Sequence, residues 1–251
     1  MDLKLKGRVA VITGASKGIG AAIAKTMAAE GASVVVNFAE SREGAARVVT
    51  EIVSNGGKAI AIQGDVSKIV DIKRIFEESK SNFGAIDILV NNAGVGKFGP
   101  AESVLEEEFH RQFNTNVLGT VLAIQEALKH FPETGGSIIN ISSVASQNPG
   151  PYTGVYAASK AAIEALTLAY AKEFATRKIR VNTIAPGSTE TEGARALINV
   201  MGKELENAMI AATPMGRFGT PEEIASVVVF LASDAAKWVT GERIKVSGGL
   251  N

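Results

Sequence analysis

The sequence of 251 residues contains no cysteine and only two histidines, His110 and His130. The absence of cysteine excludes disulfides, catalytic thiolates and zinc–thiolate sites. The two histidines do not form an HExxH motif, so we expect no metal site, and a Ser-His-Asp hydrolase is disfavoured. Thiol, metal and histidine-based chemistry is therefore not expected of this chain.

The chain also lacks an excess of charge of one sign and lacks long apolar runs. It has 26 Lys and Arg against 26 Asp and Glu, so its charge does not favour nucleic acid or an anionic membrane as a partner. No stretch approaches the ~18 consecutive apolar residues of a membrane helix. Residues 1–8 lack the apolar core and cleavage site of a signal peptide. We therefore expect a cytoplasmic protein that binds neither nucleic acid nor membranes.

Short β-branched segments alternate with longer helical patterns along the chain. The expected strands are residues 8–13, 33–38, 59–64, 87–91, 137–142, 180–185 and 242–247, and the expected helices are residues 18–29, 42–55, 68–82, 106–130, 156–177 and 221–231. Several strands are apolar almost throughout, which is typical of parallel strands buried on both faces. The alternation predicts an α/β fold, a doubly wound parallel sheet of about seven strands with helices on both faces. Without a linker to divide the chain, residues 1–251 are expected to form a single domain.

Residues 188–219 interrupt this alternation. They follow a predicted strand, contain glycine and proline, and carry a weak helical pattern over residues 194–211. A long excursion of this kind is either a mobile lid over a site or a disordered insert. Its apolar content favours a substrate lid.

A glycine-rich turn, Thr13-Gly14-Ala15-Ser16-Lys17-Gly18-Ile19-Gly20, joins the first predicted strand to the first predicted helix. Its glycines are spaced GxxxGxG and not GxGxxG. In either spacing the missing Cβ atoms let the backbone approach a pyrophosphate, whose charge is stabilised at the helix N-terminus. A glycine-rich turn without a ligand is the alternative. Three glycines in seven residues at this position favour a dinucleotide site.

Polar residues follow the third and fourth predicted strands, as Asp65-Val66 and as Asn91-Asn92-Ala93-Gly94. Any one Asp or Asn most often forms a turn. Open α/β sheets, however, bind their ligands at the carboxyl ends of the strands. The occurrence of polar residues at several such ends therefore favours a bound dinucleotide.

Tyr156 and Lys160 are four residues apart near the start of an apolar helix, so they share one face of it. A tyrosine has an ordinary pKa near ~10, and a neighbouring ammonium group is expected to lower it. Such a pair could protonate a carbonyl oxygen or deprotonate an alcohol. On its own, a YxxxK pair is more often two residues of an amphipathic helix.

Taken together, these motifs resemble the short-chain dehydrogenase/reductase family. The order and spacing of the glycine turn, Asn91–Gly94, Ser143, Tyr156–Lys160 and Pro186-Gly187 match that family, and the similarity continues to the ending Thr240–Gly249. The resemblance implies a Rossmann-like fold, a nicotinamide cofactor and hydride transfer to or from a small molecule. It is closest to the 3-oxoacyl-acyl-carrier-protein reductases and related carbonyl reductases of small ketones.

The resemblance also implies four catalytic residues. Tyr156 would be the acid–base, Ser143 would hydrogen-bond the substrate carbonyl, and Lys160 would also grip the nicotinamide ribose. Asn116 would hold a water in a proton relay with Lys160. Ser142 is the alternative to Ser143, although the spacing of thirteen residues to Tyr156 favours Ser143. With all four positions filled, a non-catalytic nicotinamide-binding regulatory protein is the weaker alternative.

The resemblance assigns further residues to the cofactor. Asp65 and Val66 would contact the adenine, and Thr191 would meet the carboxamide. The expected cofactor-binding residues are Gly14, Ser16, Lys17, Gly18, Ile19, Gly20, Asn37, Asp65, Val66, Asn92, Ala93, Gly94, Tyr156, Lys160, Pro186, Gly187 and Thr191.

The choice between NADP and NAD depends on the end of the second strand. An acid there would bind the ribose hydroxyls of NAD and repel a 2′-phosphate. This chain has Asn37 at that position and no acid before Glu40, while Lys17 offers a cation and Ser41 or Arg42 could add donors. NADP(H) is therefore favoured over NAD(H), with an NAD-dependent sugar or alcohol dehydrogenase as the alternative.

The substrate is expected to be a small ketone, a keto ester or a 3-oxoacyl thioester. Residues 132–136 carry no basic residue where carrier-protein-dependent members of the family have one, although Arg177 and Lys178 remain at a second such place. The stretch from Thr191 to Pro214 is also longer than in those reductases. A carrier protein is therefore possible as a partner but not favoured.

The predicted helices 106–130 and 156–177 are apolar around much of their circumference, which indicates burial on more than the side that faces the sheet. Members of the family bury these helices in a dimer that usually pairs into a tetramer. We therefore expect a homodimer or homotetramer, with a thick monomer core as the alternative.

Overall fold

The computed structural model describes residues 5–250, apart from the side chains at positions 197 and 201. Within these residues, seven strands form one parallel sheet in the order β3-β2-β1-β4-β5-β6-β7. The strands are β1 (Val9–Ile12), β2 (Ser33–Phe38), β3 (Lys58–Gln63), β4 (Ile88–Asn91), β5 (Gly136–Ile141), β6 (Ile179–Pro186) and β7 (Arg243–Val246). The predicted single-domain, doubly wound parallel sheet is confirmed.

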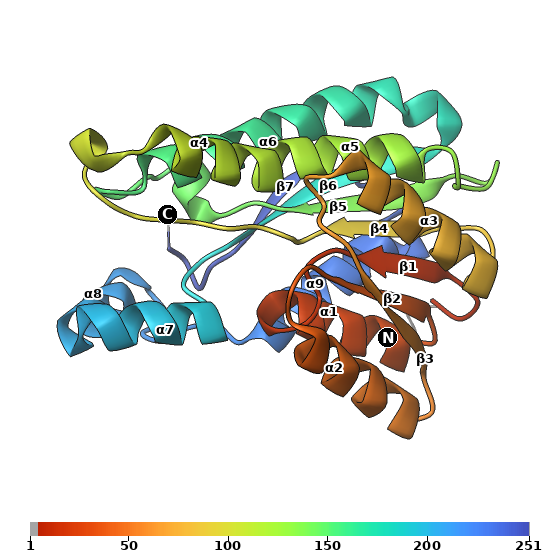
Figure 1. Cartoon of the computed structure of the whole chain (residues 1–251), viewed down its shortest axis with the longest axis horizontal. Coiled ribbons are helices and arrows are strands. Elements are labelled where there is room, and N and C mark those ends of the chain that lie inside the picture. The colour runs from red at the N-terminus through yellow and green to blue at the C-terminus, as the bar shows by residue number, and fades with distance from the viewer. Residues whose placement is uncertain (1–4, 251) are drawn as a thin grey trace.

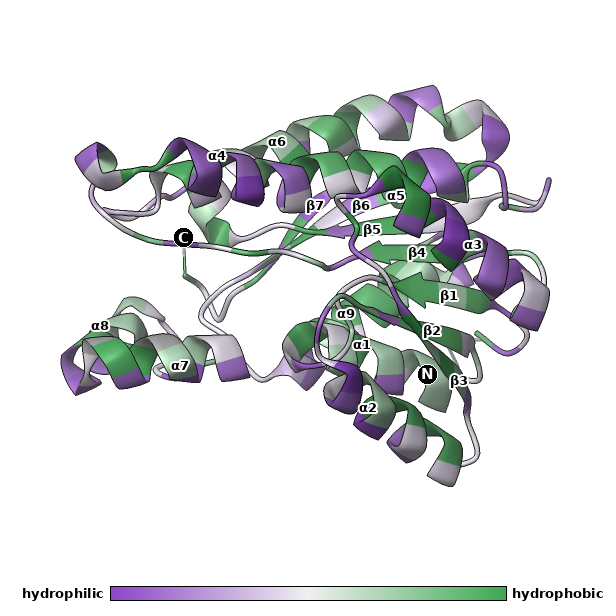
Figure 2. Ribbon diagram, viewed as in Figure 1, coloured by the Kyte–Doolittle hydropathy of each residue, from purple (hydrophilic) through white to green (hydrophobic). Residues whose placement is uncertain are grey.

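Helices cover both faces of this sheet (Figure 1). The longer helices are α1 (Gly18–Ala29), α2 (Arg42–Ser54), α3 (Ile69–Phe83), α4 (Glu106–Phe113), α5 (Gly119–Ala127), α6 (Gly154–Glu173), α7 (Glu192–Met201), α8 (Lys203–Ala212) and α9 (Pro221–Ala232). One layer contains α1, α2 and α9, and the other contains α3, α4, α5 and α6. Figure 2 shows hydrophobic strands between helices whose hydrophilic residues are most evident on α2, α3 and α4.

Alternate residues of the central strands pack against the two helix layers. Ala10 and Ile12 of β1 pack into the core under α1 and α9, whereas Val9 and Val11 pack into the core under α3 and α5. This division follows from the period of two in a strand, whose successive side chains point to opposite faces. Strand β1 is apolar and buried throughout because both of its faces are covered.

The predicted helix over residues 106–130 is interrupted in the structure. Helices α4 and α5 are joined by a π-helical turn over Asn114–Leu118. One extra residue per turn rotates the side chains that follow, and such turns occur frequently at functional sites. The spacing of apolar residues in the sequence does not reveal this turn, because a π-helical turn adds only one residue to a turn of regular helix.

Residues 188–219 fold into α7 and α8, which meet at Gly202 with a φ of 89°. The two ends of the excursion are held together, since the amide of Gly219 donates to the carbonyl of Ser188 at 2.9 Å and that of Glu190 donates to Gly219 at 2.9 Å. Figure 1 shows the helix pair standing away from the sheet near its carboxyl edge. The predicted segment is therefore a helical hairpin on a closed base, which suits a lid better than a disordered insert.

Among residues 5–250, none of the helices has both the length and the apolar character that crossing a bilayer demands. The order of the strands reverses direction between β1 and β4. At such a switch point, loops from neighbouring strands turn to opposite faces and leave room for a ligand. The glycine turn follows β1 and Asn92–Gly94 follow β4, so both motifs meet at this point.

Candidate active site

The glycine turn packs directly against the segment that follows β4. A Cβ atom on Gly14 would lie 2.8 Å from the Cα of Ala93, and one on Gly20 would lie 2.4 Å from Nδ2 of Asn92. The same Nδ2 donates to the carbonyls of Thr13 and Gly14 at 2.9 and 3.0 Å. These contacts require glycine and place the turn at the switch point of the sheet.

Helix α1 begins at Gly18, whose φ is 55°, directly after this turn. Its first turn contains no acidic residue, and its N-cap residue Lys17 makes no capping hydrogen bond with its side chain. The first N–H groups of a helix lack partners within the helix and attract an anion. A groove free of side chains beside such a helix end fits a pyrophosphate group. The exposed Lys17 side chain can add a cation.

The structure places Asn37 in β2, buried with 1% of its surface exposed. Its Nδ2 donates to the carbonyls of Ile62 and Gly64 at 3.3 and 3.1 Å, and its Oδ1 accepts from the amide of Gly14 at 3.3 Å. The Asn37 side chain therefore holds the glycine turn against β2 and the end of β3. Its predicted contact with the cofactor stays a prediction.

Ser41, just beyond the end of β2, lies closer to the glycine turn than the sequence indicates. A Cβ on Gly44 would lie 2.6 Å from the Oγ of Ser41 and 2.7 Å from the carbonyl of Ser16. Ser41 and Asn37 therefore both lie beside the glycine turn.

Asp65 and Val66 occupy the loop after β3. Asp65 accepts from the amide and hydroxyl of Ser67 at 3.0 and 2.8 Å, which makes it a turn residue. Val66 is buried against Gly119, where an added Cβ would lie 2.8 Å from the valine Cγ2. Their predicted contacts with adenine stay a prediction.

Pro186 and Gly187 end β6 and are held against the C-terminal segment. The amide of Gly187 donates to the carbonyl of Val246 at 3.0 Å, and a Cβ there would lie 2.8 Å from the Cα of Ser247. Thr191 caps α7, its Oγ1 accepting from the amide of Ala194 at 3.1 Å. Thr191 also lies against Gly18, because a Cβ on that glycine would be 3.4 Å from its Cγ2. The structure thus brings the start of α7 to the glycine turn.

Lys160 is the most deeply buried charged group of the site, with 4% of its surface exposed. Its Nζ donates to the carbonyl of Ile141 at 2.8 Å and lies 5.8 Å from the centre of the Tyr156 ring. Burial lowers the pKa of Lys160 to about 8, because removal from water disfavours the charged form. A Cβ on Gly94 would lie 3.2 Å from this Nζ, so a larger residue there would press on Lys160.

The structure reverses the expected direction of the Tyr156 pKa. Burial raises the pKa of the Tyr156 phenol, and a hydrogen bond with Ser143 lowers it in part. Lys160 does not contribute to this shift, because its ammonium group is directed to the carbonyl of Ile141. The lysine expected to stabilise the phenolate therefore contacts the ring of Tyr156 and not its oxygen.

The structure separates the two serines at the end of β5. Ser142 is buried and turns toward α6, where its hydroxyl donates to the carbonyl of Lys160 at 3.1 Å and to Glu164 at 2.9 Å. Ser143 faces Tyr156 and caps the short helix Val144–Ser146, accepting from the amide of Ala145 at 3.2 Å. The geometry favours Ser143 as the serine beside the reacting group.

Asn116 lies in the π-helical turn and is buried. Its Oδ1 accepts from the amide of Val95 at 2.8 Å, while its Nδ2 donates to the carbonyl of Val95 and to the hydroxyl of Ser159, both at 2.9 Å. Both amide protons are used within the protein. The Asn116 side chain therefore holds the loop after β4 against α6, next to Lys160.

Phe98 was not identified from the sequence. Its ring meets the ring of Tyr156 edge to face, with the centroids 5.5 Å apart. The next residue, Gly99, donates to the carbonyl of Tyr152 at 3.0 Å and so connects the loops after β4 and β5. Phe98 forms an apolar wall beside Tyr156. An aromatic residue shortly after the Asn92–Gly94 motif was the available indication.

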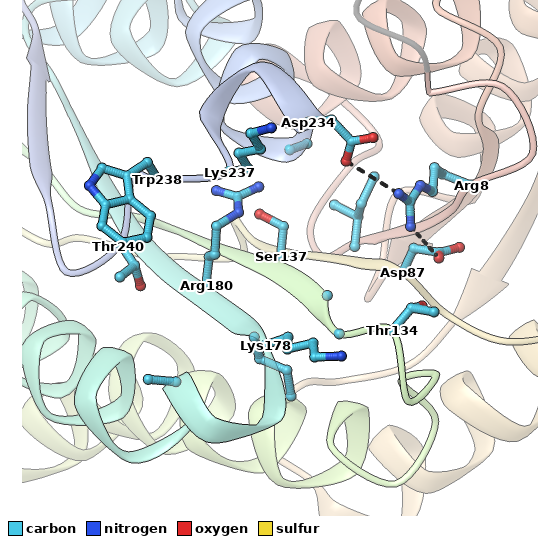
Figure 3. Close-up of a pocket in the computed structure, with 16 residues that line it drawn as sticks. Arg8, Asp87, Thr134, Ser137, Lys178, Arg180, Asp234, Lys237, Trp238 and Thr240 are labelled. Atoms are coloured by element: carbon cyan, nitrogen blue, oxygen red, sulfur yellow. Dashed lines mark hydrogen bonds and ion pairs between the residues drawn. The ribbon is translucent and has the colours of Figure 1, made fainter.

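Two hollows flank the sheet at opposite ends. One, of about 410 Å³, lies between Gly18, Thr191 and the start of α9, beside the glycine turn. The other, of about 510 Å³, is lined by Asp87, Gly136 and Ile179 at the amino ends of strands. Figure 3 shows Arg8, Asp87, Arg180 and Trp238 around this second hollow. It lies at the edge opposite Tyr156 and is separate from the candidate site.

Comparisons with known proteins identify the family of this chain. The family model described as enoyl-(acyl carrier protein) reductase matches residues 14–251. An uncharacterized oxidoreductase of Methylorubrum extorquens is 53% identical over 247 residues, covering 98% of this chain and 99% of the relative. A short-chain dehydrogenase/reductase from Serratia marcescens has a TM-score of 0.92 at 37% identity, over 98% of this chain and 99% of that chain.

An angucycline C-6 ketoreductase, LanV, solved with bound NADP, also has a TM-score of 0.92, at 36% identity over 98% of this chain and 96% of that chain. These matches extend over almost the whole length of the sequence, and the fold has the strand order and the switch-point glycine turn on which the resemblance depended. This chain therefore belongs to the short-chain dehydrogenase/reductase family of oxidoreductases.

Proposed function

We propose that this protein is an NADP(H)-dependent carbonyl reductase that converts a ketone to a secondary alcohol. The observation that carries the proposal is the grouping of Ser143, Tyr156, Lys160 and Asn116 at the carboxyl edge of the sheet, next to a glycine turn built for a pyrophosphate. The similarity to a ketoreductase solved with bound NADP supports ketone reduction as the reaction and NADP(H) as the cofactor.

A bound dinucleotide is supported by the first turn of α1, which contains no acidic residue, and by the glycine turn, where Gly14 and Gly20 pack too closely against the loop after β4 to carry a side chain. The glycine turn, Lys17, Gly94 and Thr191 would hold the cofactor. When bound, a reduced nicotinamide supplies a hydride to the carbonyl carbon. The protein must then bind the ketone, deliver a proton to its oxygen and keep water away.

Tyr156 is the proton donor in this proposal. Its hydroxyl would pass a proton to the carbonyl oxygen, and the raised pKa keeps the phenol protonated at neutral pH, as a donor requires. Ser143, which hydrogen-bonds to Tyr156, would hold the same carbonyl oxygen. Lys160 provides a positive charge beneath the ring, and Asn116 fixes the adjoining loop. In the reverse direction Tyr156 would accept the proton.

The preference for NADP(H) rests on the surroundings of the glycine turn. Lys17 is exposed, and Ser41 lies beside the carbonyl of Ser16, so a cation and a hydroxyl are available to a 2′-phosphate. Asn37 is not an acid, so this position does not repel a 2′-phosphate. An NAD-dependent alcohol dehydrogenase requires an acid that binds the ribose, and Glu40 is the candidate for it.

A free small ketone or keto ester fits the apolar surroundings of Tyr156 better than a carrier-bound thioester. Phe98 forms one wall, and the hairpin of α7 and α8 stands over the same edge as a lid. The lid and the missing basic residue in the turn before β5 are the two departures from carrier-protein-dependent reductases.

Exposed apolar residues on α4, α5 and α6 support a homodimer or homotetramer. Leu105, Phe109, Leu118 and Leu168 each expose 40% or more of their surface. Leu168 lies on α6, the helix that carries Tyr156 and Lys160. A second copy of this chain is therefore proposed to cover these helices.

The proposal is tested by oxidation of NADPH and NADH, side by side, with small keto esters, cyclic ketones and an acetoacetyl thioester. Tyr156→Phe should abolish turnover while leaving cofactor binding nearly unchanged. Tyr170→Phe, the same change farther along α6, is the matched control and should stay active. Turnover retained by Tyr156→Phe would refute the mechanism. Tight cofactor binding without turnover of any ketone would favour a regulatory protein.

A further inference from the structure

A buried ion pair lies behind the turn that carries Ser143. Glu164 of α6 and Arg243, the first residue of β7, approach to 2.6 Å between Oε1 and Nε. They are 79 positions apart in the chain, and only 11% and 15% of their side chains are exposed. Figure 1 shows α6 above the β6 and β7 side of the sheet. Glu164 lies outside the motifs that define the family resemblance, and Arg243 lies within the matching ending Thr240–Gly249.

The Glu164 carboxylate is surrounded by donors from the Ser143 turn. Its Oε1 accepts from the hydroxyl of Ser142 at 2.9 Å and from the hydroxyl of Ser146, in addition to Arg243. Its Oε2 accepts from Nε2 of Gln147 at 3.0 Å. Residues on both sides of Ser143 are therefore fastened to one carboxylate.

Arg243 reaches the same turn from the sheet. One of its terminal nitrogens donates to the hydroxyl of Ser146 at 3.2 Å and lies 3.4 Å from the carbonyl oxygen of Ser143 itself. A guanidinium group can bind several acceptors in one plane, which suits it to hold a carboxylate and a turn together. The two charges thus hold the turn from opposite sides.

This arrangement has a geometric consequence for the reacting groups. Glu164 follows Tyr156 by eight positions on the same helix, a distance of roughly 12 Å along a rigid axis. Because Glu164 binds residues on both sides of Ser143, the position of the serine relative to Tyr156 is set through α6. The helix Val144–Ser146 has only three residues and little stability of its own to fix that position.

Stability alone is a poor explanation for the pair. Removing two charges from water has a large free-energy cost, and well-packed apolar residues at a buried ion pair are often as stable or more stable. The pair is better explained by the position that it enforces on what it binds, which here is the Ser143 turn.

We propose that the Glu164–Arg243 pair is a positioning device that holds the Ser143 hydroxyl against Tyr156, an inference that rests on the reductase mechanism above. The pair touches neither substrate nor cofactor and acts through Ser143. Its loss loosens the turn, moves the hydroxyl and slows proton delivery without changing how the cofactor binds.

The test is a double-mutant cycle between Glu164 and Ser143, with kcat for a reduced ketone and the dissociation constant of the cofactor as measurements. Ser143→Ala should lower kcat on the order of 100-fold, as expected for loss of a donor to the reacting oxygen. Glu164→Gln should lower kcat on the order of tenfold, since misplacement by a fraction of an ångström weakens such a contact. In the Ser143→Ala background, Glu164→Gln should add less than about a twofold loss, because both changes then affect one interaction.

Four further variants keep the test decisive. If Glu164→Gln does not fold, Glu164→Leu combined with Arg243→Met removes both charges, leaves neither unpaired, and should show the same loss of kcat. Arg243→Lys should keep more kcat than Arg243→Met. Asp87→Asn is the matched control, because it breaks the ion pair with Arg8 at the opposite edge of the sheet and should lower stability without lowering kcat.

An equal loss of kcat in both backgrounds, or full activity of the apolar double variant, would overturn the positioning role. A change in cofactor affinity as large as the change in kcat would also overturn it. Tyr156→Phe separates the two proposals. If that variant retains turnover, the reductase mechanism is wrong. If it is inactive while Glu164→Gln is fully active, only the positioning role is wrong.

Discussion

Replacing Lys160 by methionine should stabilise the protein at neutral pH while abolishing its activity. Burial lowers the pKa of Lys160 from 10.5 to about 8, so the folded protein carries the charge at a cost. The shift corresponds to roughly 3 kcal/mol at about pH 7, from ~1.4 kcal/mol for each pKa unit. Methionine fills a similar volume without charge.

The gain is reduced by one lost hydrogen bond. Nζ of Lys160 donates to the carbonyl of Ile141, and an unsatisfied buried acceptor costs ~1–3 kcal/mol. The free energy of unfolding should therefore rise by up to about 2 kcal/mol at neutral pH. For a chain of this size the midpoint of thermal unfolding should rise by up to roughly 8 °C.

The pH dependence gives the sharper measurement. Because the folded pKa lies below the unfolded one, the unfolded state binds more protons between these values, and the stability of the unchanged protein rises with pH there. The penalty is fully present below pH 8, falls to about 1.4 kcal/mol near pH 9.5 and vanishes above the unfolded pKa. The advantage of Lys160→Met should therefore shrink by about 2 kcal/mol between about pH 7 and pH 9.5.

Urea denaturation followed by circular dichroism, at equal protein concentrations and both pH values, measures this difference. Lys172→Met is the matched control, since Lys172 is an exposed residue of the same helix and its substitution should give a difference that does not change with pH. A Lys160→Met advantage that is independent of pH, or a variant less stable than the unchanged protein at neutral pH, would refute the argument from burial.

Four other changes have defined outcomes. Gly20→Ala should lower cofactor affinity at least about tenfold by equilibrium titration. The added Cβ would overlap Asn92 and the backbone of the glycine turn, and relieving this overlap costs ~1–3 kcal/mol and shifts the turn. Ser143→Ala should lower kcat far more than Ser142→Ala, whose hydroxyl faces α6; equal losses would contradict this assignment. Leu168→Glu should convert the oligomer to smaller species in light scattering, whereas a monomeric starting protein would disprove the interface. Lys17→Glu should raise KM for NADPH more than for NADH in steady-state assays, and an equal change would argue against a phosphate contact.

Local features of the sequence were sufficient to predict the strands and the first helix. The apolar segments predicted the strands because a parallel strand is buried on both faces and needs apolar residues at every position. Helix α1 begins and ends as predicted, at Gly18 and Ala29, because the glycine turn and the residues after it form a local unit. The spacing of Tyr156 and Lys160 was also sufficient to place them on one helix face.

Only the tertiary structure decided how the groups of the site are directed. The π-helical turn that carries Asn116 differs from a regular helix by one residue, which apolar periodicity does not resolve. The burial of Asn37, and the choice between the two serines, depend on neighbours from other strands and from α6. Local sequence spacing does not contain these neighbours.

The raised pKa of Tyr156 and the Glu164–Arg243 ion pair both result from tertiary packing. Burial is a property of the assembled layers, and it outweighs the effect that a lysine four residues away was expected to have. Glu164 and Arg243 meet only because β7 joins the sheet beside β6, beneath α6. The sequence by itself therefore determined which groups are present and on which elements they lie. Folding decided their contacts and protonation, because both depend on residues distant along the chain.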